Sequence, residues 1–186
     1  MKKFIIPAFI CSAILLFSSC KKFAEGEGND EELITTMKLN FTPVGGGTTQ
    51  TFTFEDIDGA GGNTPVIDNI SLAAGTTYNV SVELWNNAAT PPENTTLEVE
   101  TENEAHRFYY TPSAGSTISV SNLNNDDNGV PLGITSTWTV GTASSGTINV
   151  TLRHYPGTPP DKQISDPINS PKSGTDITVD FNYTIL

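Results

Sequence analysis

The stretch ITVDFNYTI, residues 177–185, alternates large apolar or aromatic side chains with polar ones at every second position. A period of two places the two sets on opposite faces of an extended strand, so one face is dry and the other meets water. Half-buried strands of this kind are typical of antiparallel sheets that cover a core on one side only. The segment therefore predicts a strand of an all-β domain.

The same alternation recurs along the chain and is interrupted by turn-forming residues. The alternating segments are 37–42, 51–55, 78–84 and 148–153, and residues 106–110 are predicted to form a further strand. Turns are predicted at 45–47, 59–62, 74–75, 128–129 and 145–146, and Pro pairs at 91–92 and 159–160 end the runs before them. About nine or ten short strands at this spacing predict an immunoglobulin-like antiparallel β-sandwich. We expect Trp85 and Trp138 to fill its core.

One segment favours a short connecting helix. Residues 95–98, TTLE, fit a capping box with Thr95 as the N-cap and Glu98 at the third helical position. Acidic residues at every second position from 98 to 104 also suit a strand edge that faces water, so this alternative stays open.

The first twenty residues, MKKFIIPAFICSAILLFSSC, have the order of a secretory signal: two lysines, an apolar run at 4–17, and small residues before Cys20. The apolar run is shorter than the roughly 20 residues that cross a bilayer, although an uncleaved membrane helix flanked by Lys21 and Lys22 is the alternative. A cysteine at this place resembles the lipobox of bacterial lipoproteins. The resemblance implies cleavage before Cys20 and acylation of Cys20, for example with palmitate.

These features divide the chain into a signal peptide (1–19), an acidic flexible tether (20–32) and a β-sandwich domain (33–186). The tether sequence KKFAEGEGNDEE, residues 21–32, has too little apolar surface to fold. An acidic run behind the lipidated cysteine resembles the surface-export signals of Bacteroidota lipoproteins. It implies a lipid anchor in the cell outer membrane, with the periplasmic and extracellular faces both open.

Charge and cysteine content limit the partners. The net charge is −12, and removal of the two lysines of the signal brings the mature protein to about −14. A basic face is needed for nucleic acid or for anionic lipid, so we expect neither partner beyond the anchor itself. Cys11 leaves with the signal and Cys20 is acylated, so no thiol remains for a disulfide or a metal.

The loop EDIDGAGGN, residues 55–63, is a candidate calcium site, with Asp56 and Asp58 as ligands. Calcium takes six to eight oxygen ligands, which such loops supply. The loop is not an EF-hand, because the twelfth position from Asp56 is Ile67, where a bidentate Glu belongs. The alternative is a turn that uses Asp and Gly for its geometry. No cofactor is expected apart from this weakly bound calcium.

His106 and His154 are the two histidines of the chain, and both lie in predicted strands. Two imidazoles supply half of a zinc or copper site. No local spacing pairs them and no third ligand is identified, so we expect ordinary positions on a sheet face or edge.

An ordered set of segments covers nearly all of residues 30–186. The segments are 31–36 (EELITT), 41–43 (FTP), 56–62, 69–84, 98–110 and 146–154. This set resembles a family of small Bacteroidota lipoproteins that are often labelled as type 1 periplasmic-binding-domain proteins. That fold alternates strands with long helices around parallel sheets, whereas this chain has almost no helical periodicity. The resemblance implies no established activity.

Catalytic motifs do not emerge from the sequence, which has no Gly-x-Ser-x-Gly elbow, phosphate loop or HExxH. We therefore expect a lipid-anchored, noncatalytic cell-envelope surface protein that acts as a binding or structural module for a protein or glycan ligand. The first alternative is a calcium-stabilised adhesin-like domain. The second, with least support, is an enzyme of unknown class.

Overall fold

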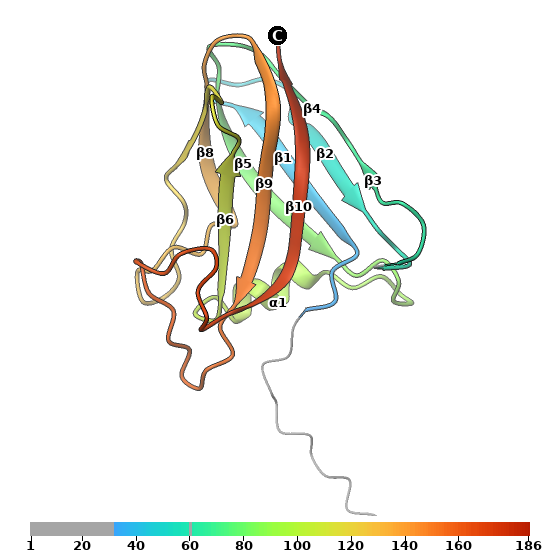
Figure 1. Cartoon of the computed structure of the whole chain (residues 1–186), viewed down its shortest axis with the longest axis vertical. Helices are drawn as coiled ribbons and strands as arrows, with labels where there is room; N and C mark the ends of the chain where they lie inside the picture. The colour runs from blue at the N-terminus through green and yellow to red at the C-terminus, as the bar shows by residue number, and fades with distance from the viewer. Residues whose placement is uncertain (1–31, 60) are drawn as a thin grey trace, which may run out of the picture.

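Two β-sheets pack face to face in the computed structural model, which describes residues 32–59 and 61–186 (Figure 1). The larger sheet has the order β3-β2-β1-β5-β8-β7 and contains β1 (Thr36–Pro43), β2 (Gln50–Glu55), β3 (Val66–Ile67), β5 (Thr77–Trp85), β7 (Ile118–Ser121) and β8 (Thr135–Val140). The smaller sheet has the order β4-β10-β9-β6 and contains β4 (Ile70–Leu72), β6 (His106–Pro112), β9 (Ser144–His154) and β10 (Gly174–Ile185).

The predicted all-β sandwich is confirmed, and its chain crosses repeatedly between the sheets as in immunoglobulin-like folds. One described pair departs from the antiparallel expectation, because β4 runs parallel to β10. This pairing follows a crossing from β3, at the edge of the larger sheet, to β4, at the edge of the smaller one.

The core lies between the sheets and follows the alternation of the sequence. In β10, Val179, Phe181 and Tyr183 are buried, and they face the buried inner side chains of the larger sheet, which include Phe41 and Trp138. Burying side chains of this size contributes about 1.5–3 kcal/mol each, so the inner faces hold the sandwich together.

Trp85 does not lie in the core, which corrects the expectation for this residue. Leu84 faces the core, so the next residue of β5 must face outward. The indole is half-buried on the outer face of the sheet, where Lys38 Nζ lies 5.8 Å from its ring centroid. Trp138 is fully buried, as expected.

The predicted turn at 145–146 is also wrong, because β9 runs straight through Gly146. A Cβ atom at this position would lie 2.6 Å from Ser113 Oγ and 2.7 Å from the Tyr183 hydroxyl. The glycine therefore permits a close approach of side chains within a strand instead of a chain reversal.

Helix α1 (Thr95–Thr101) is the short connection between the sheets, so the alternative of a strand edge is wrong. Its N-cap is Asn94 and not Thr95: the Asn94 side chain accepts a hydrogen bond from the Thr96 N–H at 3.1 Å. Thr95 is buried, and Thr96 bridges to the backbone of Leu84, so packing against β5 sets where the helix begins. No helix within residues 32–59 and 61–186 has both the length and the apolar character to cross a membrane.

The sandwich has two distinct ends, which we call the near end, where β1 begins, and the far end, where β10 ends. At the near end, β1, β6 and β10 begin, β5 and β9 end, and α1 covers the opening (Figure 1). At the far end lie the β1–β2 turn (44–49) and the C-terminal residue Leu186. The described chain therefore enters at the near end, beside α1.

Candidate functional site

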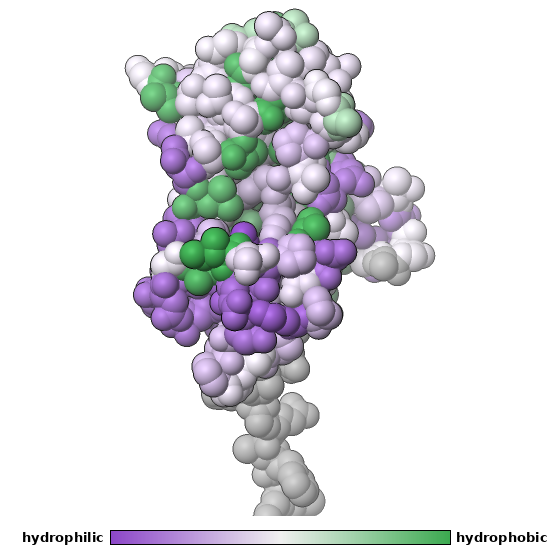
Figure 2. All heavy atoms as spheres, turned by 60° about the vertical axis from the view of Figure 1, so that its left-hand side comes forward, coloured by the Kyte–Doolittle hydropathy of each residue, from purple (hydrophilic) through white to green (hydrophobic). Residues whose placement is uncertain are grey.

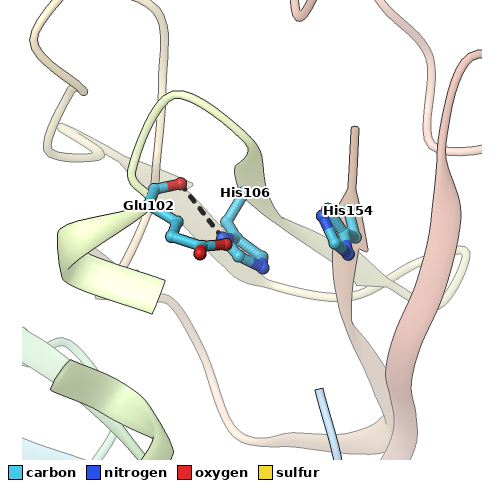
Figure 3. A group of neighbouring side chains, drawn as sticks. All are labelled: Glu102, His106 and His154. Atoms are coloured by element: carbon cyan, nitrogen blue, oxygen red, sulfur yellow. Dashed lines mark hydrogen bonds between the residues drawn. The ribbon is translucent and has the colours of Figure 1, made fainter. Parts of the chain in front are cut away.

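The two histidines meet at the near end of the sandwich. His106 begins β6 and His154 ends β9, and the two residues are direct partners in the antiparallel register. Each is in phase with a core residue of its strand, Phe108 or Leu152, so both rings face inward and are 0% and 1% exposed. Their ring centroids are 4.7 Å apart and their planes are inclined by 26°, so the two rings are stacked (Figure 3). Both histidines thus lie on a sheet face, as expected, but their pairing across two strands was not predicted.

Asp176 joins the histidines through an irregularity of β10. The register between β10 and β9 shifts between Thr175 and Ile177, so Asp176 is the extra residue of a β-bulge. A regular strand would turn Asp176 outward, in phase with Thr178, but a bulge re-aims side chains. The carboxylate is fully buried, with Oδ2 at 3.6 Å from His106 Nε2 and Oδ1 at 3.6 Å from His154 Nδ1.

Helix α1 contributes the fourth group through its C-cap, Glu102 (Figure 3). The backbone carbonyl of Glu102 lies 3.1 Å from His106 Nδ1. A carbonyl only accepts hydrogen bonds, so Nδ1 carries the proton and Nε2 presents a lone pair. The Glu102 carboxylate also lies close to the histidines, because one ligand atom each from Glu102, His106 and His154 lie within 4.8 Å of one another.

Several polar atoms of this cluster lack hydrogen bonds. Among the described residues, His106 Nε2, His154 Nε2 and both carboxylate oxygens of Asp176 are buried without a hydrogen-bond partner. The separations of 3.6 Å are too long for a hydrogen bond. An unsatisfied buried polar group costs about 1–3 kcal/mol, so four in one place indicate a functional arrangement and not a stabilising one.

Burial and neighbouring carboxylates shift the pKa values of three groups at this end of the sandwich. Burial, followed by the nearby charge of Glu98, raises the pKa of Glu32 to about 8. Burial lowers the pKa of His106 to about 4, against the opposing effect of Asp176, so this ring is neutral at neutral pH. Burial also disfavours a charged His154, but the Asp176 carboxylate outweighs it and raises the pKa of this histidine.

A surface hollow opens beside the cluster. It is lined by residues 101–105, between α1 and β6, and by Asp127, Gly157, Thr158 and Pro160. Glu102 lines the hollow and also belongs to the cluster, so an ion can approach the histidines by this route. Proton transfer to a bound substrate is a poorer fit, because both imidazoles are almost completely buried.

The predicted calcium ligands lie elsewhere, in the loop that follows β2. Asp58 Oδ2 accepts hydrogen bonds from the backbone N–H of Asn63 at 2.9 Å and from its side-chain amide at 2.6 Å. These bonds come first among the causes that lower the pKa of Asp58. A Cβ atom on Gly62 would lie 2.4 Å from the carboxylate carbon of Asp58, so the glycine makes room for this closed turn. Asp56 Oδ1 is buried without a partner among the described residues. The calcium assignment to Asp56 and Asp58 stays a prediction.

The lipidation site predicted at Cys20 lies outside the described residues. The structure thus assembles a site from the two histidines and from two acids, Asp176 and Glu102, that the sequence did not single out. The usable signal was the phase of the histidines, since each continues the inward alternation of its strand.

Comparisons with models of protein families, with curated proteins and with solved structures found no match for this chain.

Proposed function

We propose that this chain is a lipid-anchored, noncatalytic cell-envelope protein whose sandwich acts as a binding or structural module for a protein or glycan. The observation that carries the proposal is the entry of the chain at the near end. The described chain begins at Glu32, twelve residues after Cys20, and β1 begins at Thr36 beside α1. A tether of this length spans at most about 40 Å, so acylated Cys20 would hold the near end close to the membrane.

Anchoring at one end gives the sandwich a direction. The far end would face away from the membrane and present the loops 44–49, 113–117 and 141–143, which consist mostly of glycine and small polar residues. Figure 2 shows one face on which strongly hydrophilic residues gather toward the near end, while the far end carries mainly residues of intermediate hydropathy. Such polar, accessible loops suit contact with a protein or glycan, since binding residues concentrate on loops held by a rigid scaffold.

The resemblance to small Bacteroidota lipoproteins supports an outer-membrane location. The acidic tether supports the same location, and the high negative charge supports a partner other than nucleic acid.

Two measurements test the proposal. First, the wild type and Cys20→Ser are expressed with an alkyne-labelled palmitate analogue and partitioned into detergent. We expect label and detergent-phase recovery for the wild type alone; an unmodified wild-type N-terminus would overturn the anchor.

Second, single cysteines at exposed Thr48 (far end) and Thr101 (near end) carry a fluorophore in vesicles that contain a quenching lipid. The acylated Cys20 is the single native cysteine of the mature chain, so each label is unique. We expect stronger quenching at position 101 than at position 48, and equal quenching would contradict the orientation.

A further inference from the structure

The cluster of His106, His154 and Asp176 with Glu102 invites a search for its ligand. The nitrogen and oxygen atoms left without hydrogen bonds are His106 Nε2, His154 Nε2 and both Asp176 oxygens, on side chains that are 0–1% exposed. Asp176 Oδ2 lies nearest His106 Nε2, whereas Asp176 Oδ1 lies nearest the other nitrogen of the second ring, His154 Nδ1. The atoms left without hydrogen bonds are electron-pair donors when the imidazoles are neutral and the carboxylate is ionised, so a cation is the species that satisfies them together.

We propose that His106, His154, Asp176 and Glu102 form a binding site for a zinc-type divalent cation. The site would link β6, β9, β10 and the end of α1, and would close the near end of the sandwich. The proposal goes beyond an anchored module and does not depend on the lipid.

The distances fit such an ion. Ligand bonds of about 2.0–2.2 Å in a tetrahedron place neighbouring ligand atoms about 3.3–3.6 Å apart. Asp176 Oδ2 lies 3.6 Å from His106 Nε2, and Asp176 Oδ1 lies 3.6 Å from His154 Nδ1. One ligand atom each from Glu102, His106 and His154 lie within 4.8 Å of one another, so both acids lie close to the two histidines.

The surroundings of His106 match those of a metal ligand. Its Nδ1 donates to the Glu102 carbonyl at 3.1 Å, which fixes the ring orientation and leaves Nε2 as the donor atom. Metal-binding histidines commonly use their second nitrogen in this way. The hollow beside Glu102 supplies an entry path.

The donor set selects the class of metal. Two imidazoles with carboxylates suit zinc and neighbouring transition metals, whereas calcium and magnesium require oxygen ligands. Four protein ligands leave no open position, which is typical of structural and not catalytic zinc.

The experiment uses the mature, detergent-solubilised protein, stripped of metal with a chelator and then dialysed. Zinc is titrated in competition with a chromophoric chelator, and thermal unfolding is recorded with and without zinc. We expect one zinc per chain and a higher Tm with zinc, while calcium and magnesium give neither effect. A wild type that binds no stoichiometric zinc would overturn the proposal.

Matched variants lie on the same strand. Asp176→Asn removes the buried carboxylate with little change of shape, whereas Asp180→Asn changes an exposed residue of β10. Substitution of a residue that only hydrogen-bonds to a metal ligand lowers metal affinity about 10–100-fold. Asp176 is proposed as a ligand itself, so we expect Asp176→Asn to lower zinc affinity about 100-fold or more. Asp180→Asn should bind zinc like the wild type. Equal zinc affinities of the two variants would contradict the assignment of Asp176 as a ligand.

A spectroscopic measurement on the wild type tests the proposal even if a variant fails to fold. Nitrogen-15 NMR of the imidazoles resolves each ring nitrogen, and zinc should shift the Nε2 resonance of His106 while its Nδ1 remains protonated. Co²⁺ in place of zinc should give the visible absorption of a tetrahedral site. Zinc binding that leaves both histidines unshifted would place the metal elsewhere and overturn the proposal.

Discussion

Lys162 Nζ lies 2.8 Å from Asp126 Oδ2, and each of these side chains is only 2% exposed. The same ammonium group donates to the backbone carbonyls of Asn103 and His106, at 2.6 and 2.7 Å. One buried cation thus ties the loop before β8 and the long segment between β9 and β10 to the start of β6. It fixes the backbone on which the histidine cluster is built.

Lys162→Met should therefore destabilise the domain strongly. Removal of one partner of a buried ion pair leaves the other charge uncompensated, which costs about 3–5 kcal/mol. The measurement is the free energy of unfolding in urea. Lys172→Met is the matched control on the same segment, because the Lys172 side chain is 31% exposed and its ion pair with Asp166 should contribute about 1 kcal/mol or less. Equal losses in the two variants would refute this role of Lys162.

Asp126 should also give the domain a specific sensitivity to acid. Burial disfavours its charged form, but the Lys162 ammonium and the Val130 N–H outweigh burial and hold its pKa below the ordinary value. A carboxylate with a lowered folded-state pKa stabilises the protein above its unfolded-state pKa of about 3.9, and this contribution is lost as the pH falls through the folded-state pKa.

Urea unfolding at pH 5, 4 and 3 measures this dependence. The wild type should lose stability on acidification more steeply than Asp126→Asn. The neighbouring exposed residue supplies the control, and Asp127→Asn should keep the wild-type slope. A slope that is unchanged by Asp126→Asn would show that Asp126 does not carry the effect.

The two tryptophans should report two different environments. Trp138 is fully buried, with Nε1 donating to Ser136 Oγ at 2.9 Å, whereas Trp85 is partly exposed on the outer face beside Lys38. Trp85→Phe leaves Trp138, whose emission should be blue-shifted and protected from acrylamide. Trp138→Phe leaves Trp85, whose emission should be red-shifted and readily quenched. Similar quenching of both variants would contradict these placements.

Period-two patterning was sufficient to predict the sandwich, because burial on one face of a strand imposes it directly. Ile177, Val179 and Phe181 follow it, and so do the histidines, which continue the inward phases of β6 and β9. The pairing of His106 with His154 could not be predicted, because it depends on the register of two strands far apart in sequence.

Asp176 shows why the site itself was missed. Alternation alone assigns it to the outer face with Asp180, and a single-residue bulge reverses that assignment without a sequence signal of its own. Gly146 was predicted to lie in a turn but lies within β9. From sequence alone, a glycine that permits close packing cannot be distinguished from one that permits a turn. Both errors arise from tertiary contacts overriding local patterns.

The calcium prediction at Asp56 and Asp58 has a direct test. The missing twelfth-position Glu implies weak binding, with a Kd on the order of 10⁻⁴–10⁻³ M. Calcium at ten times this Kd should raise the Tm of the wild type by about 3–6 °C relative to chelator. Asp56→Asn/Asp58→Asn should abolish the rise, whereas Asp176→Asn, which alters the histidine cluster, should retain it. The hydrogen bonds from Asn63 to Asp58 already close this loop, so the absence of a calcium response in the wild type, or an unchanged response in the double variant, would leave the carboxylates a purely conformational role.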